Sequence, residues 1–225
     1  ELPSTIAVNG RKRRFLLALP TTYLSTQPHP LVFAFHGRTN SNAKARGYFR
    51  LERNATVPTL FVYPSGLKRG KSYSWSNPRD SLKTVRDLTL FDQLLRLIGD
   101  KYCVNRDRVY VVGHSLGAWF ANTLGCIRGS TVRAVASLGG GMARGPCTGR
   151  VAALLMHNPK DRLAAFSSGV RVRDHFLGHA GLTMVAPSAA HGPLACRKYV
   201  GTDVRNPVVW CPHQIDVTWR GKYYP

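Results

Sequence analysis

Acidic residues are scarce in this chain of 225 residues: 11 Asp and Glu stand against 32 Lys and Arg, which gives a formal net charge of +21. No run of about 18 consecutive apolar residues occurs, so we expect no transmembrane helix. Internal repeats and low-complexity segments are also missing, which excludes repeat proteins. With 44% hydrophobic residues, the chain is long enough to form a single domain over residues 1–225.

The excess of positive charge has two interpretations. It is either a generally basic surface or an attraction to a polyanion, such as nucleic acid, an acidic polysaccharide or an anionic membrane. The basic residues are spread along the chain, and the only true cluster is Arg11-Lys12-Arg13-Arg14. Neither a zinc-finger spacing nor an aromatic RNA-binding signature accompanies them. Specific nucleic-acid binding is therefore the weaker hypothesis.

The five cysteines contain no C-x-x-C pair, which argues against a zinc site or a thioredoxin-like motif. We expect neither a metal nor a cofactor. We predict a disulfide between Cys196 and Cys211, which flank the segment leading into the last strand. Cys103 and Cys126 are both expected at the bottom of the sheet and form the candidate second pair. Cys147 would then be the odd cysteine.

Short apolar runs alternate with helical patterns, and this order predicts an α/β fold with a largely parallel sheet. Phe15–Leu19 is expected as an early edge strand, and Asp87 as the cap of the first predicted helix. The predicted strands are Phe15–Leu19, Leu31–Phe35, Leu60–Tyr63, Val109–Val112, Val132–Leu138, Val151–Met156 and Val208–Trp210. The predicted helices are Leu88–Ile98, Leu116–Cys126 and Ala164–Leu177.

The sequence Gly113-His114-Ser115-Leu116-Gly117 lies between a predicted strand and a predicted helix. A G-x-S-x-G sequence in this context forms a sharp turn that exposes the serine hydroxyl at the top of the sheet. The pattern predicts an α/β-hydrolase fold with Ser115 as the nucleophile. The alternative is a serine that only caps the helix.

A serine that transfers acyl groups needs donors for the oxyanion that forms on the substrate. One donor is expected to be the backbone N–H of Leu116. The second is expected from the loop after the strand Leu31–Phe35, from either Arg38 or Thr39. His36, in the same loop, is interpreted as a structural histidine that holds the loop in place.

The acid of a hydrolase triad follows the serine in chain order. Asp161 comes just after the strand Val151–Met156, where this acid belongs; the alternative is a loop carboxylate paired with a neighbouring Arg or Lys. The rival carboxylates are Asp174, Asp203 and Asp216. The base should be a histidine after the last strand, and His213 is the one histidine that follows Trp210.

The chain resembles the secreted feruloyl esterases and polyhydroxybutyrate depolymerases of the α/β-hydrolase superfamily over nearly its whole length. The matching stretches are Leu31–Gly37, Val62–Leu67, Ser74–Asn77, Tyr102–Val104, Arg108–Gly117, Arg133–Gly141, Arg173–Phe176 and Pro207–Cys211. The resemblance implies hydrolysis of carboxylic esters outside the cell without a cofactor. It places Ser115 and Asp161 at the family's nucleophile and acid.

The chain departs from that family at three places. The family commonly has Asp-Gly-Gly-His shortly after the last strand, and Val217 stands in the place of this histidine. Leu182 and Thr202 replace two family cysteines, which indicates that one disulfide is absent. The helix that closes the family's sheet after its last strand has no counterpart in the sequence.

Three explanations compete for the missing histidine. The first, which we favour, is that the sequence stops early and the true base lies beyond Pro225. The second is that His213 has taken over the role. The third is that the protein is a pseudoenzyme that binds without hydrolysing.

The expected function is that of a secreted serine esterase acting on feruloyl-type cell-wall esters or on polyesters. The chain starts at Glu1, as a mature secreted protein would after cleavage. Trp75 and Trp119 are candidates for stacking on an aromatic acyl group, although such residues more often pack in a core. We expect a monomer whose partner is an ester substrate, either small or polymeric and anionic. The alternative is a catalytically impaired protein that binds anionic glycans or surfaces.

Overall fold

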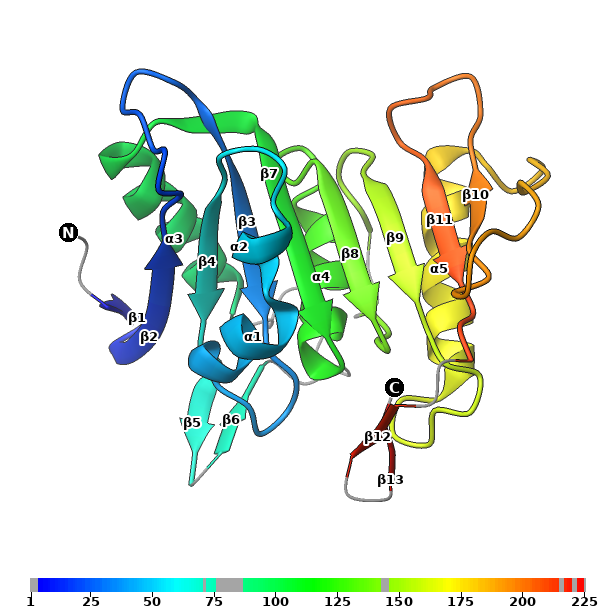
Figure 1. The fold of residues 1–225 in the computed structure, drawn as a ribbon, viewed down its shortest axis with the longest axis horizontal. Coiled ribbons are helices and arrows are strands. Elements are labelled where there is room, and N and C mark those ends of the chain that lie inside the picture. Colours follow the sequence, from blue (N-terminus) through cyan, green and yellow to red (C-terminus); the bar gives the residue numbers. More distant parts are fainter. Residues whose placement is uncertain are drawn as a thin grey trace.

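The computed structural model describes residues 4–70, 72–75, 87–142, 146–214, 217–219 and 222–224. A nine-stranded sheet lies at the centre, in the order β1-β2-β4-β3-β7-β8-β9-β11-β10 (Figure 1). Its strands are β1 Thr5–Val8, β2 Arg11–Ala18, β3 His29–Phe35, β4 Leu60–Pro64, β7 Val104–His114, β8 Ala134–Leu138, β9 Ala152–Met156, β10 Arg197–Tyr199 and β11 Val208–Cys211. Two hairpins stand apart from it: β5 Leu67–Arg69 with β6 Ser72–Ser74, and β12 Val217–Trp219 with β13 Lys222–Tyr224.

The strands from β4 to β11 in this order run parallel, whereas β1, β2 and β10 are antiparallel additions at the two edges. The predicted α/β order with a largely parallel sheet is therefore confirmed. The strand β1 pairs with the N-terminal half of β2, Arg11–Arg14, so this half is not at the edge of the sheet. The predicted edge segment Phe15–Leu19 lies in the other half, where Phe15–Ala18 pair with β4 and not with β1. The strand β1 is only four residues long, Thr5–Val8, and the sequence pattern did not reveal it.

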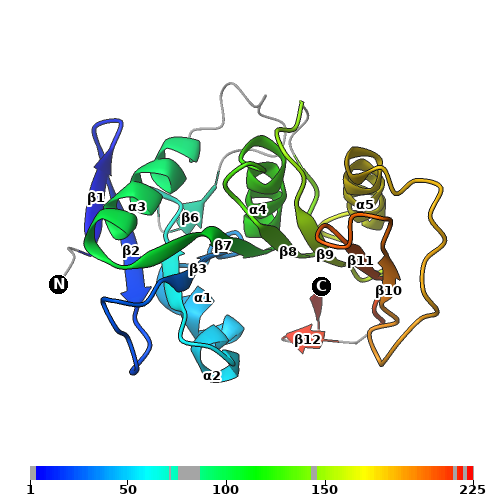
Figure 2. The same ribbon diagram turned by 90° about the horizontal axis from the view of Figure 1, so that it is seen from above.

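Helices cover both faces of the sheet (Figure 2). On one face lie α3 Leu88–Lys101, α4 Leu116–Ile127 and α5 Phe166–Ala180, which confirm the three predicted helices. On the other face lie α1 Asn42–Phe49 and α2 Leu51–Asn54, which were not predicted. Ala45 is the one buried residue of α1 and none of α2 is buried, so neither has an apolar stripe. Among the described residues, no helix is long and apolar enough to cross a membrane.

Asp87 begins α3, but its side chain does not cap the helix. Its carboxylate instead receives a hydrogen bond from Arg13 Nη2 at 2.7 Å, and both side chains are buried. The pair ties β2 to the start of α3. Because removal of one partner leaves the other charge buried and unpaired, we expect a loss of about 3–5 kcal/mol for either single truncation.

The face of the sheet opposite α4 and α5 is only partly covered. An open apolar groove of about 520 Å³ runs from α2 over β7, β8, β9 and β11. In β9, Ala153 and Leu155 are buried against the helices, while Leu154 points to the opposite face and is 39% exposed. The groove is lined mainly by side chains of this face, including Val32, Phe61, Tyr110, Ala136, Leu154 and Val209. That the helix which closes the family's sheet after its last strand has no counterpart in this sequence stays a prediction.

Candidate active site

Ser115 lies at the junction of β7 and α4, as the G-x-S-x-G pattern predicts. Its backbone has φ 53° and ψ −121°, which is a conformation that a non-glycine residue rarely adopts. Both neighbouring glycines are required by the packing. A Cβ at Gly113 would overlap the carbonyl oxygen of Gly117, and a Cβ at Gly117 would overlap the carbonyl oxygen of Phe35.

The sharp turn has a clear functional consequence. Strained backbone of this kind persists only where the surroundings hold it, and here the Ser115 N–H is bonded to the Leu138 carbonyl at 2.8 Å. The serine is therefore presented at the carboxyl end of the parallel strands, directly before the N-terminus of α4. The partial positive charge of that helix end favours negative charge nearby.

The oxyanion loop, residues 36–39, follows β3 and lies next to this turn. The N–H of Thr39 donates to the carbonyl oxygen of Tyr73 at 3.1 Å, and the N–H of Gly37 donates to Tyr48 Oη at 3.1 Å. Both amides are thus already used within the protein. Of the two predicted residues, Arg38 is the one whose N–H is not occupied by a bond within the described part of the chain. It is the better candidate to act with the Leu116 N–H.

His36 is a structural residue of this loop, as the sequence suggested. Its Nδ1 donates to the Gly37 carbonyl at 2.7 Å, and its Nε2 accepts from the Gly66 N–H at 2.9 Å. Burial lowers the pKa of His36 from 6.5 to about 4, against the opposing hydrogen bond to Gly37. The imidazole is therefore neutral, and both of its nitrogens are engaged in holding the loop.

Asp161 lies five residues beyond the last position of β9, Met156, with its side chain fully buried. Its Oδ1 accepts hydrogen bonds from the Leu163 and Ala164 amides at 2.8 and 3.0 Å. Its Oδ2 lies 3.4 Å from Nε2 of His157, a residue that the sequence reasoning missed as part of the site. Burial raises the pKa of Asp161, but the nearby His157 side chain and the hydrogen bonds from the Ala164 and Leu163 amides outweigh it and lower the pKa below 3.8.

The rival carboxylates have different surroundings. Asp174 is exposed and paired with Arg173, and Asp203 bonds to Arg205 and Asn206 near the surface. Asp216 lies outside the described residues. Of the carboxylates considered, only Asp161 is both buried and located at the end of a central strand.

His213 follows β11 by two residues and is 8% exposed. Its buried Nδ1 has no hydrogen-bond partner, and within the described residues no hydrogen bond joins its side chain to Ser115 or Asp161. Burial, and then repulsion by His157, lowers the pKa of His213. The assignment of the base, to His213 or to a histidine beyond Pro225, therefore stays a prediction.

The two candidate tryptophans occupy different environments, and the structure corrects the expectation for one of them. Trp75 is 1% exposed, donates from Nε1 to the His36 carbonyl at 2.7 Å and stacks on Phe120. Such a side chain supports the oxyanion loop from the core and offers no face to a substrate. Trp119 is half-buried in the first turn of α4 and packs against Gly141. It remains available for contact with an acyl group.

The described cysteines form two disulfides. Cys196 and Cys211 are joined, as predicted. The pairing of Cys103 with Cys126 is wrong: Cys126 bonds to Cys147, and Cys103 is free. The loop after β8 returns to the end of α4, where the Thr148 N–H donates to the Cys126 carbonyl at 2.8 Å. This return brings Cys147 beside Cys126, whereas Cys103 lies before β7.

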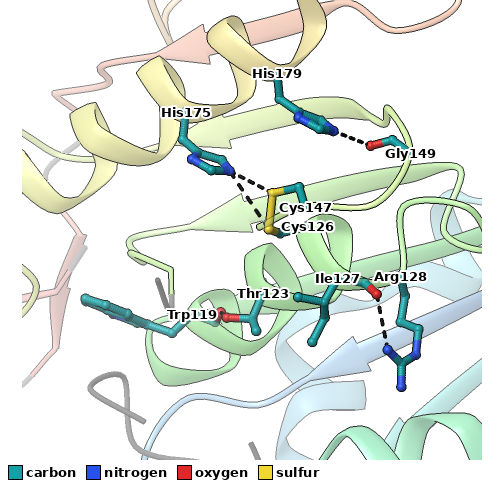
Figure 3. The surroundings of a disulfide bond; sticks show 9 residues. All are labelled: Trp119, Thr123, Cys126, Ile127, Arg128, Cys147, Gly149, His175 and His179. Atoms are coloured by element: carbon teal, nitrogen blue, oxygen red, sulfur yellow. Dashed lines mark hydrogen bonds between the residues drawn. A yellow bond between two sulfur atoms is a disulfide. The ribbon is translucent and has the colours of Figure 1, made fainter. Parts of the chain in front are cut away.

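Figure 3 shows His175 of α5 directed at the Cys126–Cys147 disulfide, with Nε2 2.7 Å from Cys147 Sγ. The three residues are close enough to hold a metal ion together. The two sulfur atoms are bonded to each other, however, and metals in such sites are bound by thiolates. In its oxidised form this cluster therefore does not provide a thiolate site.

Comparison with known proteins identifies the family and the fold. The sequence profile described as "Alpha/beta hydrolase family" matches residues 26–221. Feruloyl esterase D of Neurospora crassa is 27% identical over 94% of this chain and 76% of its own length. Probable feruloyl esterase C of Aspergillus flavus is 29% identical over 77% of this chain and 66% of its own length. The chain thus spans about two thirds to three quarters of these relatives.

Among solved structures, an acetyl xylan esterase from Aspergillus awamori superposes with a TM-score of 0.71 at 14% identity, over 92% of this chain and 91% of that chain. A ferulic acid esterase from Anaeromyces mucronatus gives a TM-score of 0.56 at 16% identity, over 79% and 78% of the two chains. At such low identities these similarities establish the fold alone.

Proposed function

Because this chain belongs to the alpha/beta hydrolase family, we propose that it is a secreted serine esterase that hydrolyses carboxylic esters. The proposed substrates are feruloyl-type esters of cell-wall polymers, with polyesters as the second option. The names of the curated relatives, which are feruloyl esterases, support this substrate class. Two disulfides fit an oxidising compartment and so support secretion.

The observation that carries the proposal is the backbone of Ser115. Its positive φ, between two glycines that the packing requires, places Ser115 in a sharp turn directly before the N-terminus of α4. A serine that only capped a helix would need no such strain, and Ser115 makes no side-chain cap bond with α4. Function is therefore argued from this site and not from the fold, which hosts many activities.

In the proposed mechanism, Ser115 Oγ attacks the ester carbonyl carbon and a histidine accepts the hydroxyl proton. The Leu116 and Arg38 amides donate to the oxyanion of the tetrahedral intermediate. The intermediate expels the alcohol, which takes the proton from the imidazolium, and leaves an acyl-enzyme. Water then releases the acid by the same steps. Asp161 orients the histidine and stabilises its charged form.

A second candidate function is a non-catalytic binder of anionic glycans or surfaces. It is favoured by the net charge of +21 and by the absence of a hydrogen bond from His213 to Ser115 or Asp161 in the described part of the chain. Such binding would be electrostatic, so adsorption to pectin should fade as the Debye length shrinks from about 10 Å at 0.1 M salt to about 3 Å at 1 M.

Hydrolysis assays separate the two functions. The wild-type protein and Ser115→Ala are incubated with a chromogenic acetyl ester and with methyl ferulate. The esterase proposal expects turnover by the wild type that disappears in the variant. Equal absence of turnover in both proteins, together with salt-sensitive adsorption to pectin, would instead support the binder.

A further inference from the structure

We propose that His157 is a positioning residue that fixes the Asp161 carboxylate so that its Oδ2 faces the catalytic base. The inference rests on the esterase function proposed above and adds a residue to it. His157 does not contact the reacting atoms in this proposal. It acts through Asp161, and the two side chains lie four residues apart in the loop that follows β9.

The two oxygens of Asp161 have different environments. Oδ1 accepts two backbone N–H bonds, from Leu163 and Ala164, and is satisfied. Oδ2 is buried and has no hydrogen-bond partner among the described residues; His157 Nε2 lies 3.4 Å from it. A buried carboxylate oxygen without a donor is costly. Oδ2 is therefore the oxygen left open for the N–H of an imidazole base.

The His157 ring is held in one orientation and one tautomer. It is 1% exposed, and its Nε2 lies 2.8 Å from the Ala164 carbonyl, which can only accept. Nε2 must therefore carry the hydrogen, and the same N–H is directed between Ala164 O and Asp161 Oδ2. Phe166 packs edge-on against the ring, and the His157 backbone N–H donates to Cys211 O at 3.1 Å. His157 thus contacts the Asp161 carboxylate through its ring and the end of β11 through its backbone, two residues before His213.

Gly169 of α5 explains how the ring fits. A Cβ at this position would overlap His157 Nδ1 and would come within 3.1 Å of Trp210 Cη2. Glycine is a poor residue for a helix interior, and the space for the imidazole accounts for it here. Gly178 of the same helix has nothing within 4 Å of such a Cβ. A methyl group added at Gly169 would therefore collide with the His157 ring, whereas one added at Gly178 would not.

His213 extends the argument to the other side of the ring. Its Nδ1 is the second buried nitrogen or oxygen in this region without a partner, after Asp161 Oδ2. His157 is close enough to repel a charge on His213 and so contributes to its lowered pKa.

The test measures kcat and KM for a chromogenic acetyl ester in a set of variants. His157→Leu removes the Nε2–H that bonds to Ala164 O and lies 3.4 Å from Asp161 Oδ2. We expect kcat to fall about 10- to 100-fold with KM within about twofold, as for loss of an interaction made in the transition state. His157→Gln keeps an N–H near the position of Nε2 and should restore kcat to within about threefold of wild type. Gly169→Ala should lower kcat as His157→Leu does, whereas Gly178→Ala should not.

A double-mutant cycle shows whether His157 acts through Asp161. In an Asp161→Asn background, His157→Leu should have little further effect on kcat. Full additivity of the two changes would overturn the proposal. So would equal losses in His157→Gln and His157→Leu, or equal kcat in Gly169→Ala and Gly178→Ala. Should His157→Leu fail to fold, the Gln and glycine variants still decide the question.

The proposed function is tested separately in the same experiment. Wild-type turnover that persists in Ser115→Ala, or no wild-type turnover at all, would overturn the esterase function and the role of His157 with it. Turnover that depends on Ser115 but is indifferent to His157 would overturn only the positioning role.

Discussion

The two halves of the candidate site differ in how completely they are hydrogen-bonded. Around Ser115 and the oxyanion loop, the His36 ring, the Gly37 and Thr39 amides and the Trp75 indole all have partners within the protein. Around Asp161, two buried atoms have no hydrogen-bond partner in the part of the chain that the structure describes: Asp161 Oδ2 and His213 Nδ1. The half that contains Ser115 and the oxyanion loop, here called the assembled half, is thus built on the central strands β3 and β7. The half around Asp161, here called the acid–base half, has no hydrogen bond between Asp161 and His213 among the described residues.

This difference indicates which part of catalysis each half controls. Preformed donors cost no reorganisation when the oxyanion develops. The acid–base half depends on an imidazole that must reach both Ser115 and Asp161, within about 2.6–3.2 Å or through one water. Substitutions in the first half should therefore test the nucleophile and the loop, and those in the second half should test proton transfer.

The largest expected effect is that of Ser115→Ala, which removes the nucleophile and leaves the assembled half otherwise intact. We expect kcat to fall by at least about 10³-fold, in line with the loss of a triad member. Thermal unfolding should remain within a few degrees of wild type, because Ser115 makes no side-chain cap bond. A variant with wild-type turnover would show that another residue is the nucleophile.

The second prediction concerns the base. If His213 fills this role, His213→Gln should lower kcat/KM by about 10²- to 10⁴-fold, the usual range for a general base. Because burial and then His157 lower its pKa from 6.5, the imidazole stays neutral to lower pH. The acid limb of the wild-type profile should therefore have its midpoint below pH 6.5. Undiminished activity in His213→Gln would exclude His213 as the base.

The sequence allowed much of this architecture to be predicted, because its strongest signals are local. The continuous apolar runs gave β3, β4, β7 and β9, and G-x-S-x-G placed Ser115 at a turn that only its flanking glycines permit. The Cys126–Cys147 pairing could not be predicted, since it depends on the loop after β8 returning to the end of α4. The burial of Trp75 likewise depends on long-range packing.

In the acid–base half, the strand Val151–Met156 pointed to Asp161 but gave no reason to consider His157. The available signal was the histidine directly at the strand end, four residues before the carboxylate. The role proposed for His157 depends also on the position of Gly169, which lies on a different element. The α1 and α2 helices were missed because almost none of their residues is buried.

The third prediction uses His36 to perturb the assembled half by pH. The folded-state pKa is about 4 and the ordinary value is 6.5. Between these values the unfolded chain binds the extra proton, so the free energy of unfolding falls as pH falls through this window. This group alone should account for a loss of about 3 kcal/mol between pH 7 and 4. Urea denaturation at both pH values measures the loss.

Carboxylates also titrate near pH 4, so the measurement needs a matched variant. In His36→Gln, the amide can still donate to the Gly37 carbonyl and accept from the Gly66 N–H, but it does not titrate. The pH-dependent loss should therefore be smaller in this variant by about the same 3 kcal/mol. An identical loss in both proteins would show that His36 does not carry it.

The smallest effect is expected for Trp119, at the exposed edge of the assembled half. Its ring packs against Gly141. Its backbone N–H donates to the Ser115 carbonyl at 3.1 Å, one turn along α4 from the nucleophile. If the ring stacks on an aromatic acyl group, Trp119→Ala should raise KM for methyl ferulate about 3- to 10-fold, since such contacts contribute about 0.5–1.5 kcal/mol. The acetyl ester has no ring to stack, so its KM should stay within about twofold.

Trp75→Phe is the matched comparison. Because Trp75 is buried, this substitution should lower the free energy of unfolding and leave the ratio of the two KM values unchanged. An equal rise of KM for both esters in Trp119→Ala would indicate that the ring positions the Gly141 loop and does not contact the acyl group.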